Sequence, residues 1–191
     1  MNQFDLKFRH IPPIAIRRTW NAEREGELAK DVPDTTSYGH NLELIWLLQH
    51  ACQVMGISTN AFDQSVKKMS EHALAYGVDW QRGGIFRDGL HQGPALIRDK
   101  EWWQQTESLV GLLAAYELTG NPRLLEAFCL TWEFADRHLI NHTVGEWRTL
   151  VNEAGEVQAP EIGNPWKACY HSGRAMNETV KRLDRILAKV A

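Results

Sequence analysis

Three residues near the end of the chain have types and a spacing that suit proton-transfer chemistry. In the stretch WKACYHSGRAMNE, His171, Arg174 and Glu178 stand at i, i+3 and i+7, so a helix places them on one face. An imidazole with its ordinary pKa of about 6.5 serves as an acid or a base near neutrality, and a guanidinium donates two parallel hydrogen bonds to an oxyanion. The stretch predicts one wall of a site, with Glu178 orienting Arg174. The alternative is a solvated Arg174–Glu178 ion pair.

A second pair of the same kind occurs in the stretch SYGHNLELIWLL. His40 and Glu43 are three residues apart, which puts the carboxylate on the same helix face as the imidazole. Glu43 is then placed to orient His40 or to accept a hydrogen bond from a substrate hydroxyl. The alternative for His40 is a residue at a helix N-terminus that bonds to a loop.

The tryptophans suggest what such a site would bind. The chain has eight tryptophans against six phenylalanines, and Trp102, Trp103 and Trp166 stand beside polar residues, with Glu107 one helical turn after the pair. A buried indole needs a partner for its N–H, whereas an indole at a site can stack its flat face on the C–H face of a sugar ring. These residues predict a carbohydrate site. Packing in the core is the alternative for each tryptophan.

Other chemistries have weaker support. Cys169 and His171 are two residues apart, so on a helix they point about 200° apart and cannot act as a nucleophile pair. No HExxH motif is present, and we expect neither a metal nor a cofactor. Asp79, Asp88 and Glu146 stay open as a glycosidase-type carboxylate pair, without a distinguishing motif. The stretch GGIFRDG lacks the lysine and the following helix of a phosphate-binding loop.

Length, composition and charge bound the class of protein. A chain of 191 residues suits one domain, residues 1–191, and 43% hydrophobic with 24% charged residues is ordinary for a soluble globular protein. A net charge of -3 provides no basic surface for nucleic acid. Three cysteines without a CxxC spacing favour the cytoplasm. Neither a signal peptide nor a membrane-spanning run of about 18 apolar residues is evident.

Helix signals place the candidate residues at the starts of successive helices. A residue among 35–37 caps a first helix that Gly56 ends, and Gly120 ends a later one. Asn121 caps the next helix, with Pro122 at its first position. The expected helices are 37–55, 58–76, 101–119, 121–139 and 165–189, with hairpins at 79–89 and 145–158.

This order is an internal repeat of two helices and a hairpin. Gly56 and Gly120 lie 64 residues apart, a period that suits stacked helix pairs forming a solenoid or closing into a toroid. Each hairpin follows the second helix of a pair (58–76 or 121–139). The hairpins therefore lie at the end where the first helices of the pairs (37–55 and 101–119) and the last helix (165–189) begin. That end forms a funnel lined by helix N-termini, which is the expected binding pocket.

Four stretches together resemble a known family. SYGHNLELIWLL, EWWQQTESLVGLLAAYELTG, GEW and PWKACYHSGRA resemble, in order and spacing, the N-acylglucosamine 2-epimerase superfamily, and most closely its cellobiose 2-epimerase branch. The resemblance covers residues 30–185 and the C-terminal half of a family member. It implies an all-α fold of the (α/α)6-toroid type, of which this chain would form about half a barrel of antiparallel helix pairs with short β-hairpin loops.

The resemblance also implies a reaction. A reducing sugar of the mannose or glucose type, an N-acylglucosamine or a cellobiose-like disaccharide loses its C2 proton, forms an enediol and regains a proton at C2 or C1. His40 and His171 are implied as the acid/base pair. The implied substrate-binding residues are Glu43, Trp102, Trp103, Glu107, Trp166 and Arg174. A truncated, inactive or sugar-binding remnant is the alternative, and a second copy or a complementing N-terminal half is the expected partner.

Overall fold

The structure is a computed structural model that describes residues 35–189. Residues 1–34, whose sequence predicts an irregular segment, lie outside the described residues. The described chain is mostly helical, as predicted. The helical segments are α2 (Tyr38–Met55), η3 (Thr59–Phe62), α3 (Asp63–His72), η4 (Ala73–Gly77), α4 (Trp102–Thr119), α5 (Pro122–Phe134), η5 (Ala135–Leu139) and α6 (Cys169–Leu187). Within 35–189, no helix combines the length and the apolar character needed to cross a membrane.

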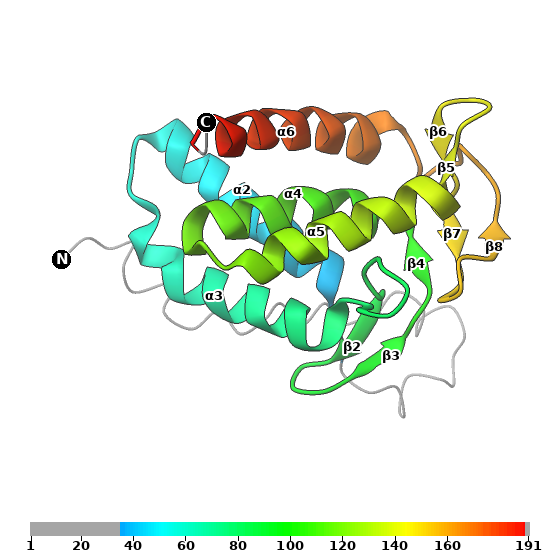
Figure 1. The fold of residues 1–191 in the computed structure, drawn as a ribbon, viewed down its shortest axis with the longest axis horizontal. Coiled ribbons are helices and arrows are strands. Elements are labelled where there is room, and N and C mark those ends of the chain that lie inside the picture. Colours follow the sequence, from blue (N-terminus) through cyan, green and yellow to red (C-terminus); the bar gives the residue numbers. More distant parts are fainter. Residues whose placement is uncertain (1–34, 190–191) are drawn as a thin grey trace.

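Among the described residues, eight short strands form three antiparallel sheets. The strands are β1 (Thr35–Ser37), β2 (Asp88–Leu90), β3 (Ala95–Ile97), β4 (Lys100–Glu101), β5 (Ile140–Asn141), β6 (Glu146–Trp147), β7 (Leu150–Val151) and β8 (Val157–Ala159). Their orders are β1-β2-β3, β4-β7-β8 and β5-β6. Figure 1 shows α2, α4 and α6 running in one direction, α3 and α5 running back, and the strands gathered where α2, α4 and α6 begin. The predicted placement of hairpins beside helix N-termini is confirmed.

The helix boundaries follow from their capping residues. The Ser37 side chain accepts a hydrogen bond from the backbone of His40, and Gly56 ends α2 with φ 63°. Gly120 ends α4 in the same left-handed conformation, with φ 70°, which glycine adopts without steric cost. Asn121 caps α5 as predicted. Helix α6 is shorter than expected: it begins at Cys169 without a side-chain cap and ends at Leu187.

Helix α4 forms the centre of the described fold and packs against α2, α3, α5 and α6. Every residue from Gln104 to Ala115 is buried, as expected of a helix surrounded by others. Its two halves differ in character. The polar first half lies beside the strands, and the apolar second half, Leu109–Ala115, packs in the core. The polar half can therefore present hydrogen-bonding groups at the strand end without weakening the core.

Helices α2 and α4 approach closely at Gly111. A Cβ at this position would lie 2.3 Å from the backbone oxygen of Leu42, so the two helices would have to separate. We expect Gly111→Ala to lower the free energy of unfolding by about 1–3 kcal/mol. Gly173→Ala, in α6, is the control because a Cβ there meets nothing within 4 Å. Urea denaturation measures both, and equal stability of the two variants would contradict the close approach.

The predicted hairpin at 79–89 is only partly correct. Val78 and Ile85 form an isolated antiparallel bridge that closes a turn, and Gln105 of α4 holds Ile85 through both backbone polar groups. Asp88 and Gly89 belong instead to β2, which pairs with β1 and β3. The alternation of the sequence could not reveal this partner, because β1 lies about 50 residues earlier in the chain.

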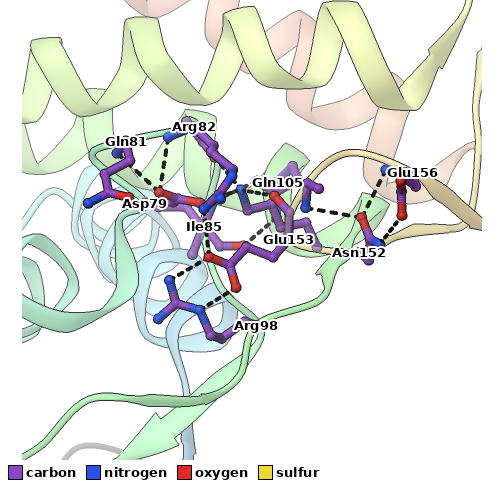
Figure 2. Close-up of polar contacts among 12 residues, drawn as sticks. Asp79, Gln81, Arg82, Ile85, Arg98, Gln105, Asn152, Glu153 and Glu156 are labelled. Atoms are coloured by element: carbon purple, nitrogen blue, oxygen red, sulfur yellow. Dashed lines mark hydrogen bonds and ion pairs between the residues drawn. The ribbon is translucent and has the colours of Figure 1, made fainter.

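A buried lysine fixes the strand that leads to α4. The side chain of Lys100 is fully buried, and its Nζ donates to Asp79 Oδ2 at 2.9 Å, to the Gly83 oxygen at 2.6 Å and to the Glu153 oxygen at 3.2 Å. Figure 2 shows the surrounding contacts, in which Arg98 holds the Glu153 carboxylate with two hydrogen bonds. The turn after η4 and the β7–β8 hairpin are thus joined beside β4, immediately before Trp102.

Candidate active site

A cavity of about 530 Å³ lies where α2, α4 and α6 begin. Its lining includes six of the eight residues predicted for the site: His40, Glu43, Trp102, Trp103, Trp166 and His171. The other two, Glu107 and Arg174, lie behind this wall and contact His171 and Glu43 respectively. The structure therefore brings together all eight predicted residues, which come from three helices and one loop.

Glu107 is the buried centre of the site. Its side chain has no exposed surface. One carboxylate oxygen accepts hydrogen bonds from His171 Nδ1 at 2.7 Å and from Arg174, and the other accepts from Trp46 Nε1 at 2.9 Å. Burial opposes ionisation, but the hydrogen bonds from His171 and Arg174 outweigh it and lower the pKa of Glu107. The carboxylate is therefore charged at neutral pH.

The contact with Glu107 decides the tautomer of His171. A carboxylate only accepts hydrogen bonds, so Nδ1 of His171 carries a proton. When the imidazole is neutral, Nε2 is then the free basic nitrogen. His171 borders the cavity with about a quarter of its side chain exposed, and Glu107 thus prepares it to accept a proton there.

Arg174 links α6, on which it lies, to α2 and α4. Its guanidinium donates to Glu43 Oε1 at 3.2 Å and to Glu107, and it lies over the rings of Tyr170 at 3.9 Å and Trp46 at 4.8 Å. Two carboxylates and two aromatic faces hold one cation in place. The planar group is therefore fixed beside the cavity rather than free in solvent.

Glu178 does not orient Arg174, contrary to the prediction. Its carboxylate accepts from Lys181 one turn further along α6, at 2.9 Å. Spacing on one helix could not show that Glu43 and Glu107 approach Arg174 from two other helices, because those contacts span 131 and 67 residues of sequence. Arg174 therefore pairs with the partly buried Glu43 and the buried Glu107 rather than with Glu178, its i+4 neighbour.

One group of side chains within 35–189 has the geometry to hold a metal ion. Ligand atoms of Glu43, Glu107 and His171 lie within 4.8 Å of one another. Arg174 already bonds to both carboxylates, so the guanidinium supplies the positive charge that a metal would bring. The donor set is better explained as an anchor for arginine and histidine.

Trp103 contacts both candidate acid/base residues. The ring centroid of Trp103 lies 4.5 Å from that of His40 and 5.7 Å from that of His171. Trp102 meets His171 edge-on at 6.2 Å and is 4% exposed, so it combines core packing with a place on the wall. Trp166 is 80% exposed at the rim of the cavity. All three indoles thus line the cavity, and Trp166 is the most exposed of them.

Burial lowers the pKa of His40 from its ordinary value of 6.5; nearby His171 lowers it further, and Glu107 partly opposes this. Below pH 6.5 the unfolded chain therefore takes up a proton that the folded chain takes up only at lower pH, and the folded state loses stability. We expect the free energy of unfolding of the wild type to fall more than that of His40→Gln as pH drops below 6.5. Urea titrations at several pH values measure this, and parallel curves would contradict it.

The pKa of Glu43 is shifted in the opposite direction, upward. Burial and the neighbouring Glu107 raise its pKa, while His171 and Arg174 act against this. A carboxyl group with a raised pKa beside an imidazole suits hydrogen bonding to a hydroxyl in either protonation state. Its position on the cavity wall, three residues after His40, agrees with the spacing that predicted it.

Sequence reasoning missed four residues that border the cavity. They are Glu101, Thr149, Asn164 and Pro165. Glu101 immediately precedes the tryptophan pair, a signal that was available but unused. Thr149 and Asn164 lie in loop segments whose approach to the helices depends on the pairing of β4 with β7, which no local pattern reveals.

The described chain is mostly helical and is similar to part of proteins that have the (α/α)6 toroid fold. It matches the cellobiose 2-epimerase from Bacillus thermoamylovorans B4167 with a TM-score of 0.70 and 29% identity, over 81% of this chain and 39% of that chain. It matches a D-mannose isomerase with a TM-score of 0.69 and 25% identity, over 76% of this chain and 38% of that chain. The class that the fold defines is thus that of the (α/α)6 toroid proteins, and the site is a cavity lined by histidine, glutamate and tryptophan side chains.

The family follows from the sequence comparisons. The protein-family model described as N-acylglucosamine 2-epimerase (GlcNAc 2-epimerase) matches residues 16–175 of this chain. Cellobiose 2-epimerase of Ruminococcus albus is 32% identical over 157 residues, which cover 79% of this chain and 39% of the relative. This chain belongs to the N-acylglucosamine 2-epimerase family. It spans about two fifths of the length of the curated relatives it matches.

Proposed function

We propose that this protein carries out proton transfer at C2 of a reducing sugar, as a 2-epimerase or an aldose–ketose isomerase. The observation that supports this most strongly is the pair of imidazoles, His40 and His171, which border one cavity and share a contact with Trp103. Epimerisation needs a base on one face of C2 and an acid on the other, and histidine serves in either role. The names of the related proteins agree with this chemistry.

In the proposed reaction, one histidine removes the C2 proton of the open-chain sugar and an enediolate forms. The other histidine then donates a proton to the opposite face of C2, which gives the epimer. Return of a proton to C1 gives the ketose instead. Arg174 and the hydrogen-bond donors near it stabilise the developing negative charge. Glu43, Trp102, Trp103, Glu107 and Trp166 hold the sugar or the catalytic groups.

Exchange with deuterated solvent tests the proposal. The protein is incubated in D2O with mannose, glucose, cellobiose or N-acetylglucosamine, and the sugars are followed by NMR. Deuterium at C2 of at least one sugar is expected. Measurable sugar binding without C2 exchange for any of the four would contradict the proposed reaction and favour a sugar-binding remnant.

Trp166 tests the sugar-binding part of the proposal separately. Its side chain is 80% exposed, so replacing it by alanine should leave the free energy of unfolding nearly unchanged. Loss of a ring that covers a bound sugar should weaken binding by about 1–2 kcal/mol, or roughly 5- to 30-fold in Kd. Isothermal titration calorimetry measures this. Trp132→Ala is the control, because Trp132 is an exposed tryptophan of α5 outside the cavity lining; equal sugar affinity in both variants would contradict the role of Trp166.

We also propose that the chain forms about half of an (α/α)6 barrel and that a second copy or a complementing half completes it. Its coverage of about two fifths of the related toroid proteins supports this. The two inner helices that flank α4 carry exposed apolar side chains: Leu47, Val54 and Met55 on α2, and Tyr170, Val180 and Leu187 on α6. Surfaces of this kind commonly bind a partner. Light scattering that shows a stable monomer at micromolar concentration would contradict self-association.

A further inference from the structure

A four-residue turn carries three of the residues that line the cavity. The turn runs from Asn164 to Lys167, with Pro165 and Trp166 at its two central positions. The backbone N–H of Lys167 donates to the Asn164 backbone oxygen at 3.0 Å and to Asn164 Oδ1 at 2.9 Å. Asparagine at the first position and proline at the second favour such a turn. The local sequence therefore fixes the shape of the turn, but not where the turn lies relative to the cavity.

Lys167 ties this turn to the rest of the fold. Residues 161–166 and 168–170 are all exposed, whereas the Lys167 side chain is only 1% exposed. Its Nζ donates to the Ile162 backbone oxygen at 3.0 Å, within the same loop, and to Glu146 Oε1 of β6 at 3.3 Å. Lysine is almost never fully buried unless it is paired. The buried ammonium is therefore a point at which an otherwise exposed loop is attached to the fold.

The carboxylate of Glu146 extends this attachment to α6. It accepts the Lys167 ammonium and, at 2.7 Å, the backbone N–H of Trp147. Its other oxygen accepts from Ser172 Oγ at 3.5 Å, and Ser172 directly follows His171 in α6. One ion pair thus joins the loop to β6 and to the helix that carries His171. Without the ammonium, the turn would keep its shape but lose this attachment.

The position of Trp166 depends on the attachment, because its side chain is 80% exposed at the cavity rim and burial does little to hold it. We propose that Lys167 is a positioning residue for sugar binding. Its ammonium holds the turn beside β6 and α6 and so keeps the Trp166 ring at the rim, where it stacks on a bound sugar. This inference rests on the proposed function, in which Trp166 contacts the sugar.

A double-mutant cycle with Trp166 tests the proposal. Lys167→Met keeps an unbranched side chain and removes the charge and its donors. It should weaken sugar binding by about 5- to 30-fold, as Trp166→Ala does, because the sugar loses the same ring in both variants. In the Trp166→Ala background, Lys167→Met should change Kd by less than about twofold, because no ring remains to be positioned. Isothermal titration calorimetry with glucose, mannose, cellobiose and N-acetylglucosamine measures all four proteins.

The rate of C2 exchange at saturating sugar separates positioning from a direct part in the reaction. Lys167→Met should keep this rate within about twofold of the wild type, because Lys167 bonds to Ile162 and Glu146 rather than to a catalytic histidine. The matched control is Glu117→Gln, which also breaks a buried ion pair but lies outside the cavity lining. It should lower the free energy of unfolding and leave Kd as in the wild type.

Thr149→Val is the second variant, for use if Lys167→Met does not fold. Thr149 Oγ1 donates to the Glu161 backbone oxygen at 2.6 Å, which is another attachment of the same loop. Valine has the shape of threonine without the hydroxyl and leaves no charge unpaired. It should weaken sugar binding by about two- to fivefold, the usual effect of losing one hydrogen bond, and should change Kd little in the Trp166→Ala background.

Two results would overturn the proposal. One is an unchanged Kd in Lys167→Met. The other is an equal loss of affinity with and without the Trp166 ring, because Lys167 would then act independently of it. If the wild type binds sugar without exchange at C2, the proposed reaction is contradicted, but the cycle still tests Lys167. If the wild type binds none of the four sugars, the proposed sugar site is contradicted and the inference falls with it.

Discussion

Replacing His171 by asparagine is expected to slow C2 proton exchange by a factor of about 10²–10⁴, the usual contribution of a positioned acid or base. Asparagine keeps a side chain that can hydrogen-bond to Glu107 but supplies no titrating nitrogen. The fold should change little, because His171 is partly exposed at the cavity wall. The rate of deuterium incorporation at C2, measured by NMR at saturating sugar, reports the loss.

The control for this variant is His142→Asn. His142 is an exposed histidine of the β5–β6 loop, and it bonds to the Asp136 backbone. Its replacement should leave exchange at the wild-type rate. A wild-type rate of C2 exchange in His171→Asn would show that His171 does not take part in the reaction. Slower exchange in both variants would point to a general effect on folding.

Replacing Glu107 by glutamine should have the largest effect on stability. The carboxylate is fully buried and compensates the charge of Arg174 while it accepts a hydrogen bond from His171. Removing one member of a buried ion pair costs about 3–5 kcal/mol. His171 would also lose the carboxylate that holds the proton on its Nδ1, so the rate of C2 exchange should fall as well. Urea denaturation and solvent exchange measure the two effects on the same protein.

Helix α4 offers a matched control ten residues further along. Glu117 accepts hydrogen bonds from Arg182 and Arg185 of α6, and Gln49 of α2 also bonds to Arg182. This arrangement repeats the bridge of Arg174 away from the cavity. Glu117→Gln should therefore lower stability but leave C2 exchange in the remaining folded protein intact. Equal loss of exchange in both glutamate variants would show that Glu107 acts through the fold alone.

The sequence was sufficient where local chemistry decides the outcome. A serine before α2, an asparagine followed by proline before α5 and a glycine after α2 and α4 fix backbone conformations within a few residues of themselves. Once the start of a helix is known, the residues that share each of its faces follow from the helical repeat. For this reason His40 and Glu43 could be placed on one helix face, and His171 and Arg174 on another.

The sequence was insufficient where contacts between distant segments decide. Arg174 could pair with Glu178 or with carboxylates on other helices, and only the packing of α2, α4 and α6 selects Glu43 and Glu107. Glu101 gains its place beside the cavity because β4 pairs with β7. Such pairings depend on tertiary geometry, which periodicity within one helix does not contain.

Helices α3 and α5 share one further feature, the way in which they end. Helix α3 passes into η4 and α5 into η5, and in both the first residue after the segment donates its N–H to an alanine oxygen five residues earlier, Ala73 or Ala135. The sequences of these segments, ALAYG and ADRHL, share little beyond that alanine. The two segments thus share a backbone geometry although their side chains differ. Because Val78 and Ile140 make the same backbone hydrogen bond, these two positions are suitable points at which to exchange the loops that follow the two helices.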